Sequence, residues 1–276
     1  MRIFKIIIRI LAFIFLTVLT QVGGVLYLFS LWTQRYTDNW TQSKYLKMTL
    51  RCASFLVIYT LATFLIVPML AKPFGRVPLP MSETNHLQPL NLLTCLLNRN
   101  YVKPELRQVA FDVAVEMNHQ FPGTTLNYLD ANFPFIDKFP LLPHLSHHDG
   151  KKLDFAFCYR DAKTNNPTNE CPSFTGYGIC EEPLSDEVNS PEYCAGIGFW
   201  QYSILTNVMP QGNKKDFVFD LEKTKAMVNL IAQQTEIEKI YIEPHLKNRM
   251  QLTSGKIRYH GCHAVRHDDH LHIQIK

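Results

Sequence analysis

The C-terminal stretch RHDDHLHIQIK, residues 266–276, places three histidines and two aspartates within its first seven positions. The chain has eleven histidines, and eight of them fall in two short windows, residues 144–148 and 260–272. Each window runs into a segment of alternating polar and apolar residues that is typical of a β-strand. Because successive side chains of a strand point to opposite faces, His270 and His272 are expected on one face of a C-terminal strand.

The other window leads into a predicted strand at residues 153–158, which Asp154 opens. His147 lies seven positions earlier, across a turn that contains Gly150. If the two strands are neighbours in a sheet, His147, Asp154 and His272 can converge on one point. Two imidazoles, one carboxylate and an open fourth position form the ligand set of catalytic Zn²⁺, which lowers the pKa of its water to about 7. The sequence therefore predicts a hydrolytic zinc site.

Both windows resemble the signature motifs of a known family. HLSHHDGKKLD, residues 144–154, and HDDHLH, residues 267–272, are similar to the HxSHxxGxxxD and HxxHxH motifs of the penicillin-insensitive murein endopeptidases. IEKIYIEPHLK, residues 237–247, resembles the strand between those motifs. The resemblance covers roughly residues 120–276 outside the stretch 160–215, and it implies the fold of the LAS group, which comprises lysostaphin-type, D-Ala-D-Ala and hedgehog-domain proteins.

The resemblance also implies a role for each motif residue. It makes His147, Asp154 and His272 the metal ligands, and His270 the catalytic residue that assists the attacking water and steadies the oxyanion. His144 and His267 are expected to line the cleft beside them. The sequence has no HExxH glutamate, so a histidine must serve as the base.

Other polar residues near these motifs are expected to be bystanders. His148 and Asp149 are predicted to face solvent, and His260, His263 and His245 to lie at the surface. Whether Tyr128 and Asp130 reach the cleft from a neighbouring strand is left open.

Residues 1–72 are predicted to form a membrane hairpin. The run Ile10–Trp32 has no charged residue and is about long enough to cross 30 Å of hydrocarbon, and Cys52–Ala71 is a second uncharged run. A cleavable signal peptide is the alternative for the first run, but its apolar stretch is too long and lacks a cleavage site. A buried core helix is the alternative for the second, which has no polar face.

A hairpin places the remaining chain in the compartment of the N-terminus, and flanking charges do not distinguish the two sides. Six cysteines lie in the soluble part, without the CxxC spacing of a structural zinc site. They are expected to form disulfides in an oxidising space, which favours a bacterial inner-membrane protein with a periplasmic or otherwise extracytoplasmic domain. The alternative is a set of unconnected thiols in a cytosolic core.

The soluble part is predicted to be α+β, with an antiparallel sheet and flanking helices that carry the zinc site. A helix is expected after Pro104, with apolar residues at helical spacing up to Met117, and a second from Asp220 to Gln234. Strands are expected at residues 125–133, 153–158 and 238–244 and at the C-terminus. Residues 73–101 are interpreted as a linker and lead-in, and 102–276 as the zinc peptidase domain with a cysteine-rich insertion at 160–215.

Composition restricts the function classes. The chain has 276 residues, 46% of them hydrophobic and 19% charged, with a formal net charge of +4 and no basic stripe of the kind that binds nucleic acid. The leading hypothesis is a membrane-anchored zinc peptidase that hydrolyses amide bonds in peptidoglycan cross-links. The alternatives are a non-catalytic zinc module that binds cell-wall peptide or a partner protein, and a cytosolic dipeptidase with reduced cysteines.

Overall fold

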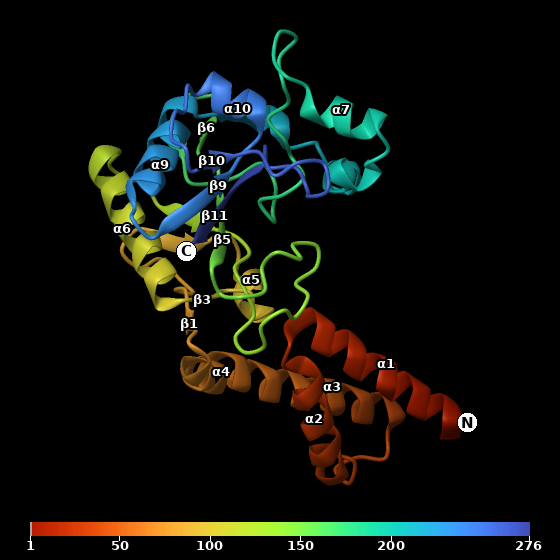
Figure 1. Ribbon diagram of the computed structural model, residues 1–276. Helices are drawn as coiled ribbons and strands as arrows, with labels where there is room; N and C mark the ends of the chain where they lie inside the picture. Colours follow the sequence, from red (N-terminus) through yellow and green to blue (C-terminus); the bar gives the residue numbers. More distant parts are fainter. Residues whose placement is uncertain (1) are drawn as a thin grey trace.

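The computed structural model describes residues 2–276 and combines a helical N-terminal part with an α+β domain (Figure 1). The C-terminus lies in the sheet of the α+β domain, and the N-terminus lies at the far end of the helical part. The predicted α+β class is confirmed. The main sheet has six strands in the order β10 (Ile257–Arg258), β9 (Ile237–Tyr241), β11 (His270–Ile275), β5 (Lys152–Ala156), β4 (Leu126–Tyr128) and β2 (Leu87–Pro89).

The centre of this sheet is antiparallel, as predicted, while its edges are not. β11 pairs antiparallel with both β5 and β9, whereas the edge pairs β10 with β9 and β2 with β4 are parallel. In the register of β11 and β5, His272 lies opposite Asp154 and His270 opposite Ala156. Directly opposed residues of antiparallel strands have Cβ atoms about 5 Å apart, so this register brings two predicted ligands together.

Two long helices pack beside the sheet (Figure 1). Helix α6 (Pro104–Gln120) starts with proline in its first turn, where the missing N–H costs nothing, and buries Leu106, Val113 and Met117 on one face. Helix α9 (Leu221–Gln233) is capped by Asp220, whose side chain accepts from the backbone N–H of Lys223. Burial of each large apolar side chain contributes about 1.5–3 kcal/mol, so these faces hold the helices on the core.

Residues 73–101, expected to be a linker, are folded into the domain. They form β1 (Val77–Pro78), the edge strand β2, α5 (Leu92–Leu96) and β3 (Tyr101–Val102), and β1 pairs with β3. Leu79 and Leu87 are fully buried in the main core. The linker interpretation followed from the polar, proline-rich composition of this stretch, which gives no sign that these two leucines anchor it in the core.

The insertion at 160–215 forms a small structure of its own. β6 (Tyr159–Asp161) pairs with both β7 (Pro167–Thr168) and β8 (Phe217–Phe219), so the two ends of the insertion meet in a three-stranded sheet. Between them lie α7 (Ser190–Gly196), the 3₁₀ helices η3 (Trp200–Ser203) and η4 (Lys214–Asp216), and α8 (Ile204–Val208). A short helix outside the insertion, α10 (Pro244–Arg249), follows β9.

The expectation that six cysteines form disulfides is wrong for four of them. Within residues 2–276 the structure has one disulfide, Cys194–Cys262, which ties α7 to the loop before β11. Cys95, Cys158 and Cys180 are buried free thiols, and Cys171 is a half-buried one. Cysteine is often buried as a small apolar residue, and these four pack in that way.

The predicted single span at residues 10–32 is also corrected. The apolar run is divided between α1 (Arg2–Thr20) and α2 (Gly23–Thr37), and a third helical segment follows. That segment runs without interruption through α3 (Lys44–Leu61), the π-helical turn η1 (Ala62–Ile66), α4 (Val67–Ala71) and η2 (Lys72–Phe74). Two helices, Ile3–Thr20 and Lys44–Phe74, are long and apolar enough to cross a membrane.

The break between α1 and α2 has local causes. Gln21 adopts a positive φ of 65°, and the Thr20 hydroxyl accepts from the N–H of Gly23 at 2.8 Å. Gly24 then passes so close to α1 that a Cβ atom would lie 2.7 Å from the carbonyl oxygen of Phe13. The Gln21 side chain, in turn, accepts from the N–H of Phe135 at 2.8 Å, which fixes the break against the α+β domain.

Candidate metal centre

Three segments meet at the predicted site: β5, β11 and the loop that precedes β5. His147 comes from the loop, and its ring is completely buried. His147 Nδ1 lies 2.7 Å from the carbonyl oxygen of Ala131, which can only accept, so Nδ1 carries the proton. With the proton on Nδ1, it is Nε2 that faces the site, the arrangement of a metal-ligating histidine.

His147, Asp154 and His272 converge as the sequence predicted. Asp154 Oδ1 lies 2.9 Å from His272 Nδ1 and 3.3 Å from His147 Nε2, and the two imidazole nitrogens are 3.0 Å apart. Ligand atoms around a tetrahedral ion with bonds of 2.0–2.1 Å are separated by roughly 3.3 Å. The three atoms therefore have nearly the spacing of one face of such a coordination shell.

The hydrogen bonding of this cluster also fits a cation. A proton on His272 Nδ1 can join the two imidazoles, but Asp154 Oδ1 is buried and has no hydrogen-bond partner in the described part of the chain. A buried carboxylate oxygen is costly unless a donor or a positive charge faces it. The donor set of two imidazoles and one carboxylate therefore fits a divalent transition metal such as zinc.

His144 lies closer to the carboxylates than a residue that merely lines a cleft. Its Nδ1 is 3.6 Å from Asp154 Oδ2 and 3.3 Å from Asp130 Oδ2, and its ring is buried. His144, His147 and Asp154 by themselves form a buried group with ligand atoms within 4.8 Å of one another. Both nitrogens of His144 lack a hydrogen bond among the described residues, so His144 is a further donor within reach of a metal.

The protonation states of the predicted ligands suit metal binding. Burial alone would raise the pKa of Asp154, but His147, His270 and His272 outweigh it and hold that pKa well below the ordinary value. Burial lowers the pKa of His272 to about 3, against the pull of Asp154. At neutral pH the site thus offers an ionised carboxylate and an uncharged imidazole, the forms that bind metal.

His270 has a different environment from His272. Its Nδ1 is paired with Asp269, whose other oxygen accepts from the backbone N–H of Gly178. Its Nε2 is buried without a hydrogen bond and lies 3.7 Å from Asp154 Oδ2. Burial disfavours its protonation, but Asp269 and Asp154 prevail and raise the pKa to about 9. His270 is therefore largely protonated at neutral pH, and its Nε2 lies beside the ligand set.

Tyr177, from the insertion, contacts the site and was not predicted. Its hydroxyl donates to Asp154 Oδ2 at 2.8 Å and accepts from the backbone N–H of Asp130 at 3.0 Å. Its ring lies 4.5 Å from that of His144 and 4.8 Å from that of His270, between ring centroids. Tyr177 thus occupies one carboxylate oxygen of Asp154 and leaves Oδ1 directed at the two imidazoles.

A cavity of about 320 Å³ opens beside the cluster. His144, His267 and His272 line it, and the sequence predicts that His144 and His267 line a cleft. Gln201 and Ile204 of the insertion form another part of its wall. The disulfide Cys194–Cys262 joins this wall to the loop at 260–265, so the insertion and the C-terminal motif enclose the cavity together.

One of the residues expected to lie at the surface does not. His245 is fully buried, which corrects its predicted surface position, and its Nε2 lies 2.8 Å from the carbonyl oxygen of Glu181. His260 and His263 are exposed as predicted, although both border the cavity. Asp130 reaches the site through His144, whereas the Tyr128 hydroxyl donates away from it, to the carbonyl of Pro80 at 2.6 Å.

Comparison with known proteins gives no assignment. No family model matches this chain, and no curated protein matches it. The murein endopeptidase resemblance therefore rests on the two motifs and on the geometry of their residues.

Proposed function

We propose that this protein is a membrane-anchored zinc metallopeptidase that hydrolyses amide bonds in the peptide cross-links of bacterial peptidoglycan. One observation carries the proposal. His147 Nε2, His272 Nδ1 and Asp154 Oδ1, from segments more than a hundred residues apart, lie 2.9–3.3 Å from one another in a buried site. When bound there, zinc supplies an electrophile for the scissile carbonyl and lowers the pKa of a water molecule to about 7.

The residues around the ligand set can perform the proton transfers. His270 Nε2 accepts a proton from the attacking water in the uncharged form of the ring, and Asp269 steadies the imidazolium that results. The same protonated ring then donates to the oxyanion or to the departing amine. His144 and His267 border the cavity and are placed to orient the peptide. Tyr177 keeps Asp154 in one orientation during these steps.

The choice of peptidoglycan as substrate is supported by the motifs at 144–154 and 267–272 and by the proposed anchor. The retention of His270, which a site that only binds metal does not need, favours hydrolysis over binding alone. A membrane-anchored domain also suits a polymer that does not diffuse.

The test uses the full chain in detergent. Metal analysis after dialysis is expected to give about one zinc per chain, and cross-linked murein is expected to be cleaved into muropeptides with free amino groups. A chelator should stop the cleavage and added zinc should restore it. Zinc without cleavage would indicate the non-catalytic binding module, and no zinc would contradict the metal site itself.

We further infer that the helical part crosses the membrane three times rather than twice, with α2 as the additional pass. α2 has 15 residues and is about 22 Å long, so the bilayer must be thinner around it than around the two longer spans. α1 and α3 both begin at the end remote from the α+β domain, where Figure 1 shows the N-terminus and the 38–43 loop. The break at Gln21 lies at the domain end, since Gln21 bonds to Phe135. Three passes place the α+β domain on the side opposite the N-terminus, and this differs from the predicted hairpin.

Three passes also place the basic residues of the helical part unequally on the two sides of the membrane, whereas a hairpin divides them nearly evenly. The end of the helical part that is remote from the α+β domain, here the remote end, has all its basic residues on one side of the membrane. The end beside the α+β domain has only Lys72 and the fully buried Arg76. By the positive-inside rule the remote end is cytoplasmic and the α+β domain extracytoplasmic. The basic residues of the remote end are Arg2, Lys5, Arg9, Arg35, Lys44, Lys47 and Arg51.

Paired reporter fusions distinguish the two topologies. Alkaline phosphatase fused after Lys276 is expected to be active, and a fluorescent protein fused before Met1 is expected to fluoresce in the same cells. A hairpin predicts that the two ends share a compartment, so phosphatase activity at both ends would contradict three passes.

A further inference from the structure

The three N-terminal helices enclose a cavity of about 760 Å³ that the peptidase site does not use. Each helix contributes one face to it, with residues at helical spacing. Lys5, Arg9 and Leu16 come from α1, and Arg51 and Phe55 from α3, while α2 supplies the wall between them. The cavity is thus formed by the packing of the three helices.

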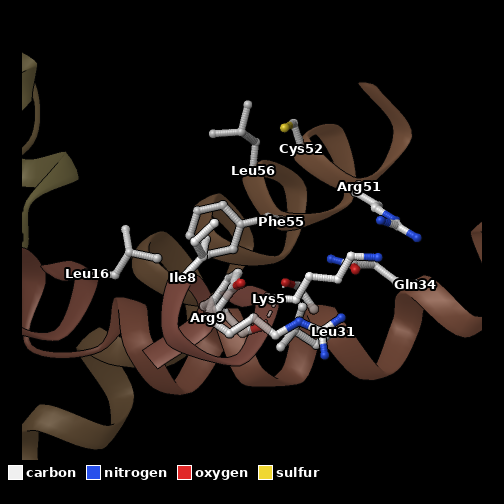
Figure 2. Close-up of a pocket in the computed structure, with 12 residues that line it drawn as sticks. Lys5, Ile8, Arg9, Leu16, Leu31, Gln34, Arg51, Cys52, Phe55 and Leu56 are labelled. Atoms are coloured by element: carbon white, nitrogen blue, oxygen red, sulfur yellow. Dashed lines mark hydrogen bonds between the residues drawn. The ribbon is translucent and has the colours of Figure 1, made fainter. Parts of the chain in front are cut away.

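One end of this cavity is cationic. Figure 2 shows Lys5, Arg9 and Arg51 gathered near Gln34. Arg51 is paired with Asp38, through Nε at 2.9 Å, and Asp38 is the only acidic residue among the first 72. Neither Lys5 nor Arg9 has an ion pair among the described residues, and they lie one helical turn apart, where like charges repel. This end therefore attracts an anion.

The other end of the cavity is apolar. Leu16, Phe55 and Leu56 line it, on the side away from the basic groups in Figure 2. Lys5 and Leu16 are eleven residues apart on α1, which is about 16 Å along a helix. One leaflet of a bilayer has a hydrocarbon depth of about 15 Å, half of the 30 Å core. The cavity thus matches a molecule with an anionic head and an acyl chain.

We infer that this cavity binds one anionic phospholipid of the leaflet that faces away from the α+β domain. Its phosphate lies between Lys5 and Arg9, and an acyl chain lies along Leu16 and Phe55. The inference rests on the membrane anchorage proposed above. A free phosphate ion fits the basic end alone and leaves the apolar half without an occupant, so the lipid accounts for more of the cavity.

The test places the full chain in phosphatidylcholine vesicles that contain traces of spin-labelled phosphatidylglycerol or spin-labelled phosphatidylcholine. The motionally restricted fraction of each probe gives its relative association with the protein. Each basic side chain near an anionic lipid is worth about a fivefold preference, so the parent is expected to prefer phosphatidylglycerol at least about fivefold. The double variant Lys5→Gln/Arg9→Gln is expected to lose most of that preference.

The matched control is Arg35→Gln/Lys44→Gln. It removes the same two charges from the same end of the helices, at exposed positions outside the cavity, and is expected to keep the preference. Equal loss in both double variants, or a parent without preference, would overturn the lipid site while leaving the anchor intact. Displacement of the probe by excess inorganic phosphate would show a site for a soluble anion instead. A parent that does not sediment with vesicles would overturn the anchor as well.

Discussion

Asp154→Ala is expected to weaken zinc binding by more than about 100-fold, the largest effect on metal affinity of any substitution outside the two ligand histidines. Asp154 is the only acidic member of the predicted ligand set, and its side chain is completely buried. Its carboxylate lies within 4 Å of His144, His147, His270 and His272. Without it, the predicted ligand set offers imidazoles alone, and a dication would have no carboxylate among its direct ligands; Asp130 and Asp269 face His144 and His270 instead.

Competition with a chromophoric chelator measures this affinity directly. Asp149→Ala is the matched control, because Asp149 lies in the same motif but pairs with Lys152 rather than with the histidines, so its loss is expected to leave zinc affinity unchanged. Tyr177→Phe should give an intermediate result. It removes the hydrogen bond to Asp154 Oδ2 without removing a ligand, and such outer contacts are typically worth 10- to 100-fold in affinity. Equal affinities for Asp154→Ala and the parent would rule out the proposed ligand set.

The residues of the site were predictable because local patterns determine their positions. The alternation of LHIQI and LDFAF predicted two strands, and the ligands were predicted to converge if these strands are neighbours in a sheet. Once β11 pairs with β5, the two-residue period of a strand puts His270 and His272 on the face of Asp154. The first and last ligands are 125 residues apart, but each lies in a segment whose conformation is set by its neighbours in sequence.

The parts that were missed depend on contacts between distant segments. Tyr177 lies in an irregular insertion with no period, and its role arises only because the three-stranded sheet closes the insertion over β5. The burial of His245 is likewise set by its contact with Glu181 of that insertion. The break at Gln21 has a local signal in the pair Gly23 and Gly24, which an unbroken hydropathy run conceals.

His270→Ala is expected to lower the rate of murein cleavage by about 10²- to 10⁴-fold, the range for loss of a general acid–base group. His270 is outside the predicted ligand set, and its Nε2 lies 3.7 Å from Asp154 Oδ2, the oxygen that Tyr177 also contacts, so the bound zinc should stay near the parent level. Loss of activity at constant metal content is the result that separates a catalytic histidine from a ligand. Kinetics and metal analysis on the same preparation provide the cleavage rate and the zinc content.

His260→Ala is the control for this variant. His260 also borders the cavity, with its ring 5.4 Å from that of His267, but it is exposed and lies outside the carboxylate cluster. The variant His260→Ala should therefore lose little activity. Asp269→Asn should fall between the two, because the imidazole remains while the carboxylate that holds its Nδ1 is gone. If His270→Ala lost zinc together with activity, His270 would itself be a ligand, and the base would have to be sought first among His144 and His267, the other two motif histidines that line the cleft.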